Sequence, residues 1–370
     1  MLSRMEKLRI GIIGCGQIAR SHLTNYQKIA GAEVVAVCDI MEAAATSAAK
    51  DFTVPSHYTD FREMLKRTDI DAVDVCLHNN FHAPVTIEAL RAGKHVYCEK
   101  PMAGSYRDAQ AMLKARDETG KHLSIQLFTI FTNETRATKA LIDAGELGKV
   151  YHARSTGHRR RGRPYVDGYG TPTFVQKCNS AGGALYDMGV YHISQLLYLL
   201  GNPTVERVSG KTYQEIDMDP ARRASSGYDV EELGIGFVRF AGNLSMDVIE
   251  AWAIHLDKIE GSTIVGSKGG VRLEPFGFFQ NIGDLSLTST GDLSNASMRW
   301  SNVHGTGDLF ASAQHHWVNA NLGKVPLIPT AEIALNTMLI SEGIYQSEKL
   351  GREVTAAEIR DLSVSTAVKV

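Results

Sequence analysis

The stretch LRIGIIGCGQIA, residues 8–19, joins a short apolar, β-branched run to the start of a helix-like run. Its G-x-G-x-x-A spacing places Gly14, Gly16 and Ala19 at the junction between the two runs. Glycines at such a junction permit a tight turn and let the backbone approach a pyrophosphate, whose charge the helix N-terminus stabilises. Asp39 ends the next apolar run about twenty residues after Ala19, where a carboxylate that binds ribose is expected. The stretch therefore predicts the first βα turn of a dinucleotide-binding Rossmann domain.

The cofactor expected at this turn is NAD rather than NADP. A carboxylate at position 39 accepts hydrogen bonds from a ribose diol and repels a 2′-phosphate, although Arg20 lies nearby in sequence and would offset part of that repulsion. An ordinary tight βα turn without a ligand is the alternative. We expect the turn and the acid to contact the cofactor through Gly14, Gly16, Gln17, Ile18, Ala19 and Asp39.

Strand-like and helix-like runs alternate from Leu8 to about Thr129. This rhythm is typical of parallel βαβ units, and strands that are apolar throughout fit a sheet covered on both faces. Farther along, longer alternating runs separated by Gly, Asn and Asp turns indicate hairpins, and the stretch 333–351 has the pattern of a closing helix. The predicted fold class is α/β: an N-terminal Rossmann domain with a doubly wound parallel sheet (1–129), then an α+β domain with a large, mainly antiparallel open sheet (130–370).

Composition argues against several other classes of protein. The formal net charge is −2 over 370 residues, which argues against a nucleic-acid-binding surface, and no apolar run approaches the length of a membrane span. The five cysteines form no C-x-x-C pair and no metal-ligand spacing, so we expect reduced cysteines and no metal site. We expect a soluble, cytoplasmic protein that acts on a small molecule.

Two further stretches carry candidate catalytic groups. HVYCEKPMAGS ends a strand near Lys100, at the carboxyl edge of the parallel sheet where such folds bind ligands; a solvated lysine at a strand end is the alternative. LYDMGVYHI, residues 185–193, sets Asp187, Tyr191 and His192 close together. In an α-helix, residues four apart share a face, whereas a residue five along is rotated by about 140°. We therefore expect Tyr191 to share a pocket with Asp187, and His192 to pack under the helix or meet solvent.

In this order, the glycine turn, CEKPMAGS and GGALYDMGVYHISQLLYLLG resemble the glucose-fructose oxidoreductase / inositol dehydrogenase / MocA (Gfo/Idh/MocA) family of sugar and cyclitol oxidoreductases. The resemblance spans nearly the whole chain. It implies that Lys100 is the catalytic lysine of the E-K-P motif, that Asp187 is the aspartate of the second-domain motif and that the acid/base residue, usually histidine, is Tyr191. It also implies that Glu99 and Lys100 lie beside the cofactor, and that the open face of the second sheet forms a homodimer or homotetramer.

The loop HNNFHAP, after the fourth strand, matches the family pattern T-P-N-x-x-H through Asn80 and His82. The resemblance implies that both residues lie near the cofactor, although Asn79 stands in place of the usual proline. Helix capping by these polar residues is the alternative.

These groups suit transfer of a hydride between nicotinamide and the carbinol carbon of a sugar, cyclitol or glycoside. Tyr191 would exchange the proton of the substrate oxygen, Lys100 would polarise that oxygen and depress the pKa of the tyrosine, and Asp187 would orient a hydroxyl or the catalytic pair. A phenol with an ordinary pKa near ~10 needs about 4 kcal/mol of stabilisation to accept a proton as readily as a histidine with a pKa near ~6.5.

Two residues outside these motifs are candidate substrate ligands. The loop HRRRGRPYVDGYGTP concentrates arginines, and Arg161 would form part of a pocket wall that binds a polyhydroxylated or acidic sugar through its forked donors. A solvated basic loop or an inter-subunit contact is the alternative. Lys177 lies ten residues before Asp187, where family members place a polar residue close to the substrate.

Two other functions stay open from the sequence. Some relatives hold NAD tightly and cleave glycosidic bonds through transient oxidation at C3 followed by elimination, and others have lost catalysis and act as NAD-sensing regulators. The intact set of Lys100, Asp187 and Tyr191 argues against a regulator, because an abandoned active site has no chemical reason to keep all three.

Overall fold

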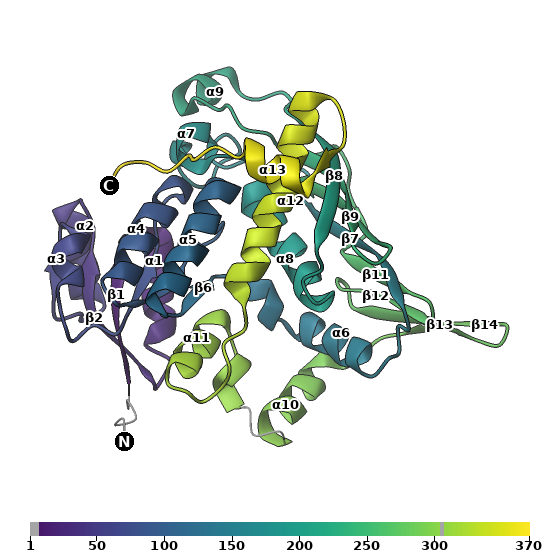
Figure 1. Cartoon of the computed structure of the whole chain (residues 1–370), viewed down its shortest axis with the longest axis horizontal. Helices are drawn as coiled ribbons and strands as arrows, with labels where there is room; N and C mark the ends of the chain where they lie inside the picture. Colours follow the sequence, from purple (N-terminus) through teal and green to yellow (C-terminus); the bar gives the residue numbers. More distant parts are fainter. Residues whose placement is uncertain (1–6, 304–306) are drawn as a thin grey trace.

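The computed structural model of the chain describes residues 7–303 and 307–370 and contains two sheets (Figure 1). The first sheet is parallel, with the strand order β3-β2-β1-β4-β5-β6 of a dinucleotide-binding Rossmann domain, which confirms the predicted doubly wound sheet. Its strands are β1 (Leu8–Ile13), β2 (Ala32–Cys38), β3 (His57–Tyr58), β4 (Ala72–Val75), β5 (His95–Cys98) and β6 (Leu123–Ile125). Its helices are α1 (Gln17–Tyr26), α2 (Glu42–Asp51), α3 (Phe61–Leu65), α4 (Asn79–Arg91) and α5 (Tyr106–Thr119).

The carboxyl ends of the central strands of this sheet meet at one edge. The backbone N–H of Gly14 bonds to the carbonyl of Cys38, that of Cys76 to the carbonyl of Ile13, and that of Glu99 to the carbonyl of Val75. Each strand end is therefore fixed to its neighbour, because parallel strands exchange hydrogen bonds along their whole length. The glycine turn and the E-K-P motif come to the same edge in this way.

The second sheet has nine strands in the order β14-β13-β12-β11-β7-β10-β9-β8-β15. Every neighbouring pair is antiparallel except β7 with β10, which confirms the prediction of a large, mainly antiparallel sheet. Its strands are β7 (Val150–His158), β8 (Val205–Tyr213), β9 (Leu233–Phe240), β10 (Leu244–Ala251), β11 (Thr263–Gly266), β12 (Gly269–Arg272), β13 (Gly277–Ile282), β14 (Leu285–Ser289) and β15 (Val354–Thr355).

The remaining elements are α-helices and short helical turns, the latter labelled η: η1, η2 and η4 are 3-10 turns and η3 is a π turn (Figure 1). Between β6 and β8 lie η1 (Phe128–Phe131), α6 (Asn133–Asp143), η2 (Pro172–Val175), α7 (Lys177–Ser180), η3 (Leu185–Gly189) and α8 (Val190–Leu199). The rest are α9 (Pro220–Ser226), α10 (Leu293–Val303), η4 (Gly307–Phe310), α11 (Ala313–Asn321), α12 (Thr330–Leu350) and α13 (Ala356–Leu362).

Helix α12 confirms the predicted closing helix and belongs to both halves of the molecule. It packs against α8 and β8 on one side and against α5 and β6 on the other, and it ends at Gly351 in the left-handed conformation. The C-terminal tail also returns to two helices that flank the first sheet, because the hydroxyl of Thr366 donates to Asn80 of α4 and its backbone N–H donates to Asp108 of α5. The proposed division of the chain after residue 129 stays a prediction.

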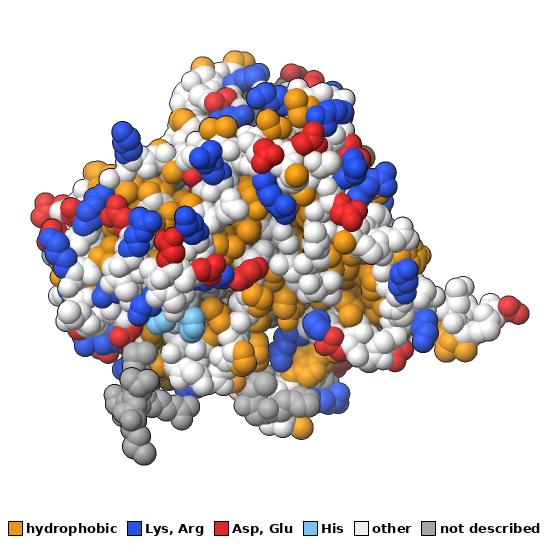
Figure 2. All heavy atoms as spheres, in the orientation of Figure 1, with side chains coloured by type: hydrophobic (Ala, Val, Ile, Leu, Met, Phe, Trp, Pro, Cys, Tyr) orange, Lys and Arg blue, Asp and Glu red, His pale blue; other side chains and the backbone are white. Residues whose placement is uncertain are grey.

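The surface mixes charges of both signs. On the face drawn in Figure 2, Lys and Arg side chains are interspersed with Asp and Glu side chains, and apolar atoms lie between them. Within residues 7–303 and 307–370, no helix is both long and apolar enough to cross a membrane. Four of the five cysteines are buried, all five are free thiols, and Cys178 is exposed.

Candidate active site

The glycine turn leaves open space where a pyrophosphate would bind. Gly14 has a φ of 93°, and a Cβ there would lie 2.2 Å from the carbonyl oxygen of Cys76, so only glycine fits. A Cβ on Gly16 would meet nothing within 4 Å. Helix α1 begins at Gln17 without a side-chain cap, so its first N–H groups have no side-chain acceptor. This open helix N-terminus fits the phosphates of a dinucleotide.

Asp39 is fixed at the mouth of this turn. Its carboxylate accepts the backbone N–H of Cys15 at 2.8 Å and that of Met41 at 2.9 Å. Arg20, whose charge would favour a 2′-phosphate, instead pairs with Asp51 at 2.9 Å and donates to Ser47. The arrangement of Asp39 and Arg20 fits a ribose diol. Of the other residues predicted to contact the cofactor at this turn, Gln17 and Ile18 are exposed and Ala19 is buried.

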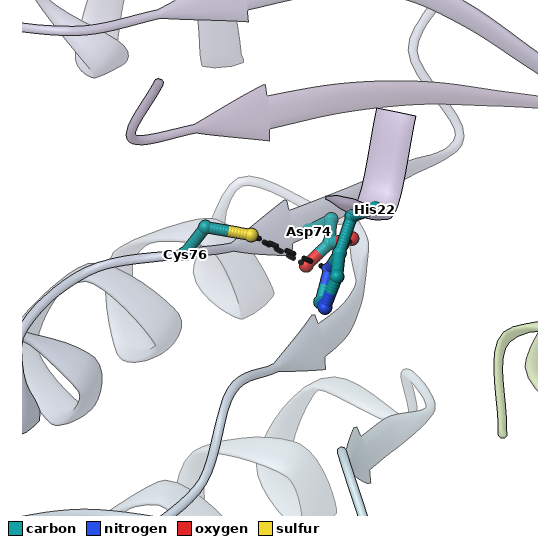
Figure 3. Close-up of side chains that lie close together, drawn as sticks. All are labelled: His22, Asp74 and Cys76. Atoms are coloured by element: carbon teal, nitrogen blue, oxygen red, sulfur yellow. Dashed lines mark hydrogen bonds and ion pairs between the residues drawn. The ribbon is translucent and has the colours of Figure 1, made fainter. Parts of the chain in front are cut away.

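A buried polar cluster lies under the same edge of the sheet (Figure 3). His22 places Nδ1 2.8 Å from Oδ2 of Asp74 and 3.4 Å from Sγ of Cys76, and its Nε2 lies 2.9 Å from Oε1 of Glu99. Burial acts to lower the pKa of His22, but the charges of Asp74 and Cys76 and the hydrogen bonds with both side chains together outweigh burial and raise that pKa well above the ordinary value. A protonated His22 therefore pairs with two buried carboxylates at once, which offsets part of the cost of burying their charges.

Three predicted catalytic residues come together at the end of β5. The Nζ of Lys100 donates to Oδ1 of Asp187 at 2.7 Å and to its backbone carbonyl at 3.1 Å. The same Nζ lies 4.6 Å from the centre of the Tyr191 ring. The side chains of Lys100 and Asp187 keep 13% and 24% of their exposure, so the pair borders solvent. The backbone of Lys100 is also held in place, because its N–H donates to the carboxylate of Glu99 at 3.0 Å.

Burial and the ion pair set the charges of these groups. Burial acts to lower the pKa of Lys100 and to raise that of Asp187, but each charge stabilises the other, so the lysine pKa is raised and the aspartate pKa is lowered. Burial raises the pKa of Tyr191 to about 12, while Lys100 acts in the opposite direction. Lys100 thus acts on the tyrosine pKa in the predicted direction, but in this structure burial outweighs the ammonium.

The backbone that carries these residues is not a simple α-helix. Residues 185–189 form a π turn, and α8 continues from Val190. A π turn winds more slowly than an α-helix, so the fifth residue returns closer to the starting direction than α-helical geometry predicts. The Nε1 of Trp252 donates to Oδ2 of Asp187 at 2.8 Å, and Nδ1 of His192 lies 2.9 Å from Oε2 of Glu250. His192 does pack under the helix, but as the partner of a buried acid.

Sequence reasoning missed both of these strand residues. Trp252 is 1% exposed and directly follows the last residue of β10. The alternation of side chains along a strand places Glu250 and Trp252 on the same side of the end of β10, toward η3 and α8. Two neighbouring side chains on one side of the end of β10 therefore bind His192 and Asp187. The sequence alone does not show that these four residues meet.

Asn80 and His82, which the sequence placed in a loop after the fourth strand, lie instead in the first turn of α4 and are tied to protein partners. The Nδ2 of Asn80 donates to the carbonyl of Cys178 at 2.6 Å, and its Oδ1 accepts the hydroxyl of Thr366. His82 is fully buried, with its ring nitrogens 2.7 Å and 3.0 Å from the carbonyls of Pro101 and Leu77. These two side chains fasten the loops around the cofactor edge to one another, and their direct contact with cofactor stays a prediction.

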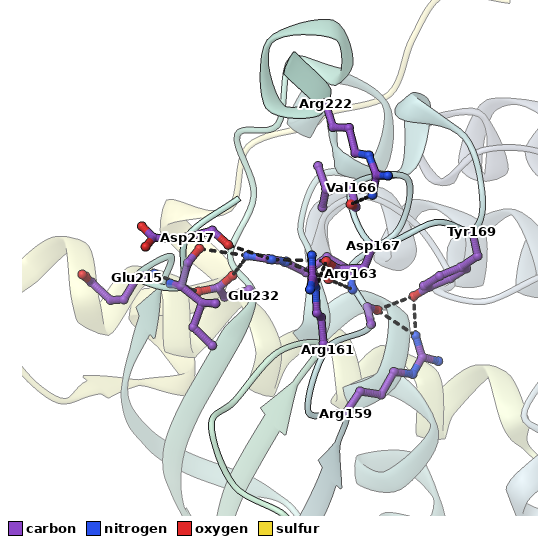
Figure 4. Close-up of polar contacts among 12 residues, drawn as sticks. Arg159, Arg161, Arg163, Val166, Asp167, Tyr169, Glu215, Asp217, Arg222 and Glu232 are labelled. Atoms are coloured by element: carbon purple, nitrogen blue, oxygen red, sulfur yellow. Dashed lines mark hydrogen bonds and ion pairs between the residues drawn. The ribbon is translucent and has the colours of Figure 1, made fainter. Parts of the chain in front are cut away.

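The arginine loop divides into structural and site-facing residues (Figure 4). Arg163 is 1% exposed and forms 2.9 Å ion pairs with Asp167 and with Glu232. Arg161 pairs with Asp167 at 3.0 Å and is 69% exposed. Arg159 donates to the hydroxyl of Tyr169, and its charge contributes to the lowered pKa of Asp187. Within this loop, Arg159 therefore acts electrostatically on Asp187.

The two predicted substrate ligands are not joined to the catalytic cluster by any contact in the described part of the chain. Lys177 is exposed at the start of α7, where its backbone N–H donates to Asp229 at 2.6 Å. Arg161 is engaged with Asp167 as described above. Their roles stay predictions.

Comparison with known proteins identifies both halves of the chain. Residues 8–127 match a family model described as an oxidoreductase family with an NAD-binding Rossmann fold, and residues 135–272 match the GFO/IDH/MocA C-terminal domain. D-glucoside 3-dehydrogenase of Escherichia coli is 30% identical over 361 residues, which cover 94% of this chain and 97% of that protein. Inositol 2-dehydrogenase of Salmonella typhimurium is 34% identical over 152 residues, 40% of this chain and 45% of that protein.

Solved structures share the fold. Levoglucosan dehydrogenase in complex with NADH and levoglucosan superposes with a TM-score of 0.78 at 21% identity, covering 95% of this chain and 99% of that one. An oxidoreductase from Agrobacterium radiobacter, solved with NAD⁺, L-tartaric acid and magnesium, gives 0.76 at 20% identity and covers 95% and 99% of the two chains.

The Rossmann sheet, its open glycine turn and the matched family description define an NAD-binding oxidoreductase. The chain belongs to the Gfo/Idh/MocA family, which confirms the resemblance seen in its motifs.

Proposed function

We propose that this protein is an NAD-dependent dehydrogenase that oxidises a secondary hydroxyl of a D-glucoside, at C3 of the sugar. The observation that carries the proposal is the contact of Lys100 with both Asp187 and Tyr191 at the edge of the Rossmann sheet. The substrate class is supported by the relative named D-glucoside 3-dehydrogenase, which aligns with 94% of this chain. The carboxylate at Asp39 supports NAD over NADP, because Arg20 is engaged with Asp51.

The cofactor, when bound, supplies the hydride acceptor for oxidation and the hydride donor for reduction. The turn at Gly14 and Gly16 would hold its pyrophosphate and Asp39 would hold its ribose. Every other step belongs to the side chains of this protein. These must bind the substrate oxygen, orient it and move its proton.

Lys100 has one N–H left for the substrate. An ammonium carries three donors, and two of them bond to the side chain and backbone of Asp187. The third lies on the side of Tyr191, whose pKa Lys100 acts to lower by its charge and by a hydrogen bond, and there it would polarise the substrate oxygen. Asp187 and Trp252 together fix the direction of the ammonium. In this proposal Asp187 keeps Lys100 charged and oriented, and the lysine holds the reacting oxygen.

Tyr191 would exchange the proton of that oxygen. With a pKa of about 12 the phenol is neutral at physiological pH, so it donates a proton to a carbonyl oxygen directly when a ketone is reduced. In the direction of oxidation it must accept a proton, and the adjacent Lys100 ammonium stabilises the phenolate that forms. Exposed Arg161 and Lys177 would contact parts of the sugar remote from the reacting carbon.

The test is an incubation of the purified protein with NAD and a panel of methyl β-D-glucoside, other glucosides, inositols and keto-sugars. NADH absorbance and sugar products are followed together, with NADP as the matched control. The proposal predicts NADH and a 3-keto-glucoside from methyl β-D-glucoside, at a higher rate with NAD than with NADP. Free sugar without net NADH would instead indicate redox-assisted glycoside cleavage, and NAD binding without either product would indicate a regulator.

A further inference from the structure

His192 is oriented by a buried acid. Its Nδ1 lies 2.9 Å from Oε2 of Glu250, and the other oxygen of Glu250 accepts the hydroxyl of Ser155 at 2.9 Å. The side chain of Glu250 has 0% exposure, whereas that of His192 keeps 27%. A buried carboxylate that binds one imidazole nitrogen fixes both the ring orientation and the tautomer, as in histidine general bases that are oriented by an acid.

The contact with Glu250 determines which nitrogen of His192 is free. A carboxylate only accepts hydrogen bonds, so Nδ1 carries the proton that it donates to Glu250. In the neutral ring Nε2 is then the acceptor, and it has no protein partner in the described part of the chain. Burial acts to lower the pKa of His192, but the charge and hydrogen bond of Glu250, together with the charge of Glu274, outweigh burial and raise it. His192 can therefore take up a proton at Nε2 and release it again.

The fold reserves space for this pair. A Cβ on Gly157 of β7 would lie 2.2 Å from Cε1 of His192 and 2.4 Å from Oε2 of Glu250. A Cβ on Gly189 would lie 3.1 Å from Cγ of Glu250. Any larger residue at position 157 would displace the imidazole or the acid, so the pair is built into the backbone of both the sheet and the π turn.

The same elements that hold the pair also hold the catalytic cluster. Glu250 binds His192, and Trp252, two residues further on the same side of the strand end, binds Asp187. The charge of Arg159 acts on the pKa values of both Asp187 and His192. His192 also directly follows Tyr191. A second acid/base group therefore lies next to Tyr191 in the chain, on a strand end that also holds Asp187. Tyr191 alone would suffice for the proton of the reacting oxygen.

We propose that His192, oriented by Glu250, exchanges a proton at the carbon next to the ketone that hydride transfer produces, an inference that rests on the proposed dehydrogenase function. The C–H bond breaks, its proton moves to Nε2 of His192, and its electron pair forms an enolate that the Lys100 ammonium stabilises. Return of a proton from the imidazolium restores the C–H bond. No oxidant or reductant enters this step, and the site thereby catalyses enolisation of a keto-sugar.

The test is incubation of the protein with NAD and methyl β-D-glucoside in D₂O. Hydride transfer is followed by NADH absorbance, and deuterium at the carbon beside the oxidised one is measured by NMR and mass spectrometry, relative to a protein-free solution of methyl 3-keto-β-D-glucoside. His192→Asn keeps a donor for Glu250 near the position of Nδ1 and deletes Nε2. Glu250→Gln provides a second variant, and thermal unfolding checks that both variants are folded.

His152→Asn is the matched control. His152 pairs with Asp247 at 2.9 Å on the same two strands, with 30% exposure, but on the opposite face of the sheet. We expect the ratio of deuterium exchange to hydride transfer to fall at least about 100-fold in His192→Asn and to be unchanged in His152→Asn.

Each outcome separates the two proposals. Oxidation by the wild-type protein without excess deuterium, or an unchanged ratio in folded His192→Asn, overturns the role of His192 and leaves the dehydrogenase intact. A raised KM with an unchanged ratio makes His192 a substrate ligand and likewise overturns it. If methyl β-D-glucoside gives no NADH at all, the proposed function fails, and this inference fails with it. Release of methanol together with exchange supports the inference, because elimination begins with the same abstraction.

Discussion

The hydrogen bond from Trp252 to Asp187 predicts a measurable link between stability and catalysis. Trp252→Phe removes the Nε1–H that donates to Oδ2 at 2.8 Å and leaves most of the aromatic packing. Hydrogen bonds to charged groups contribute about 1.5–3 kcal/mol. Trp317→Phe is a matched control, because Trp317 is 0% exposed and its Nε1 has no hydrogen-bond partner in the described residues. The free energy of unfolding of Trp252→Phe should therefore fall by about 1.5–3 kcal/mol more than that of Trp317→Phe.

Denaturant unfolding and steady-state turnover measure the two effects of Trp252→Phe. Its kcat/KM should fall by about 10- to 100-fold, because 1.4 kcal/mol corresponds to about a factor of ten and Asp187 orients Lys100. The folded pKa of Asp187 is lowered, so its contribution to stability is present above the unfolded pKa and is lost as pH falls through the folded pKa. The loss of unfolding free energy in Trp252→Phe should therefore become smaller as pH falls through the folded pKa of Asp187. Equal losses in the two tryptophan variants would refute the reasoning.

Three further predictions concern the Rossmann domain. Gly14→Ala should lower the melting temperature, because its Cβ would lie 2.2 Å from a carbonyl oxygen, whereas Gly16→Ala should melt like the wild type and raise the Kd for NADH in a fluorescence titration. Asp39→Asn should raise the Kd for NAD more than that for NADP, and an equal effect on both would contradict its role at the ribose. The pKa of His22 is raised in the folded protein, so its contribution to stability is complete below the unfolded pKa and is lost as pH rises through the folded pKa. The wild type should therefore be more stable than His22→Asn at low pH, and this difference in the free energy of unfolding should decrease as pH rises.

The parts of the molecule that follow from local spacing could be predicted from the sequence. The glycine turn and Asp39 are tied to a strand and a helix by short-range geometry, and the structure has them in that arrangement. The meeting of Lys100 with Asp187 and Tyr191 came from family motifs rather than from physics, because 87 residues separate Lys100 from Asp187.

Other features required the fold itself. The spacing of residues in the sequence does not reveal the π turn at 185–189. α-Helical geometry therefore predicted the side of the helix on which His192 lies but not its contact with Glu250. Glu250 reaches it through the pairing of β10 with β7, where Gly157 leaves room. The sequence does not distinguish Arg163 from the other arginines of its loop. In the structure it is buried and forms an ion pair with Glu232, which lies 69 residues away in the chain. Glu250 and Glu232 are both far from their partners in sequence, in or directly beside another strand, and sequence periodicity does not specify such pairings.

The most direct test of the central claim compares the wild-type protein with Tyr191→Phe in oxidation of methyl β-D-glucoside by NAD, followed by the absorbance of NADH. Tyr191→Phe keeps the ring beside Lys100 and removes only the hydroxyl. We expect unchanged NADH affinity and a kcat lower by about 10²- to 10⁴-fold, the usual contribution of a general acid or base. Turnover near that of the wild type in the folded variant would contradict the assignment of the proton to Tyr191.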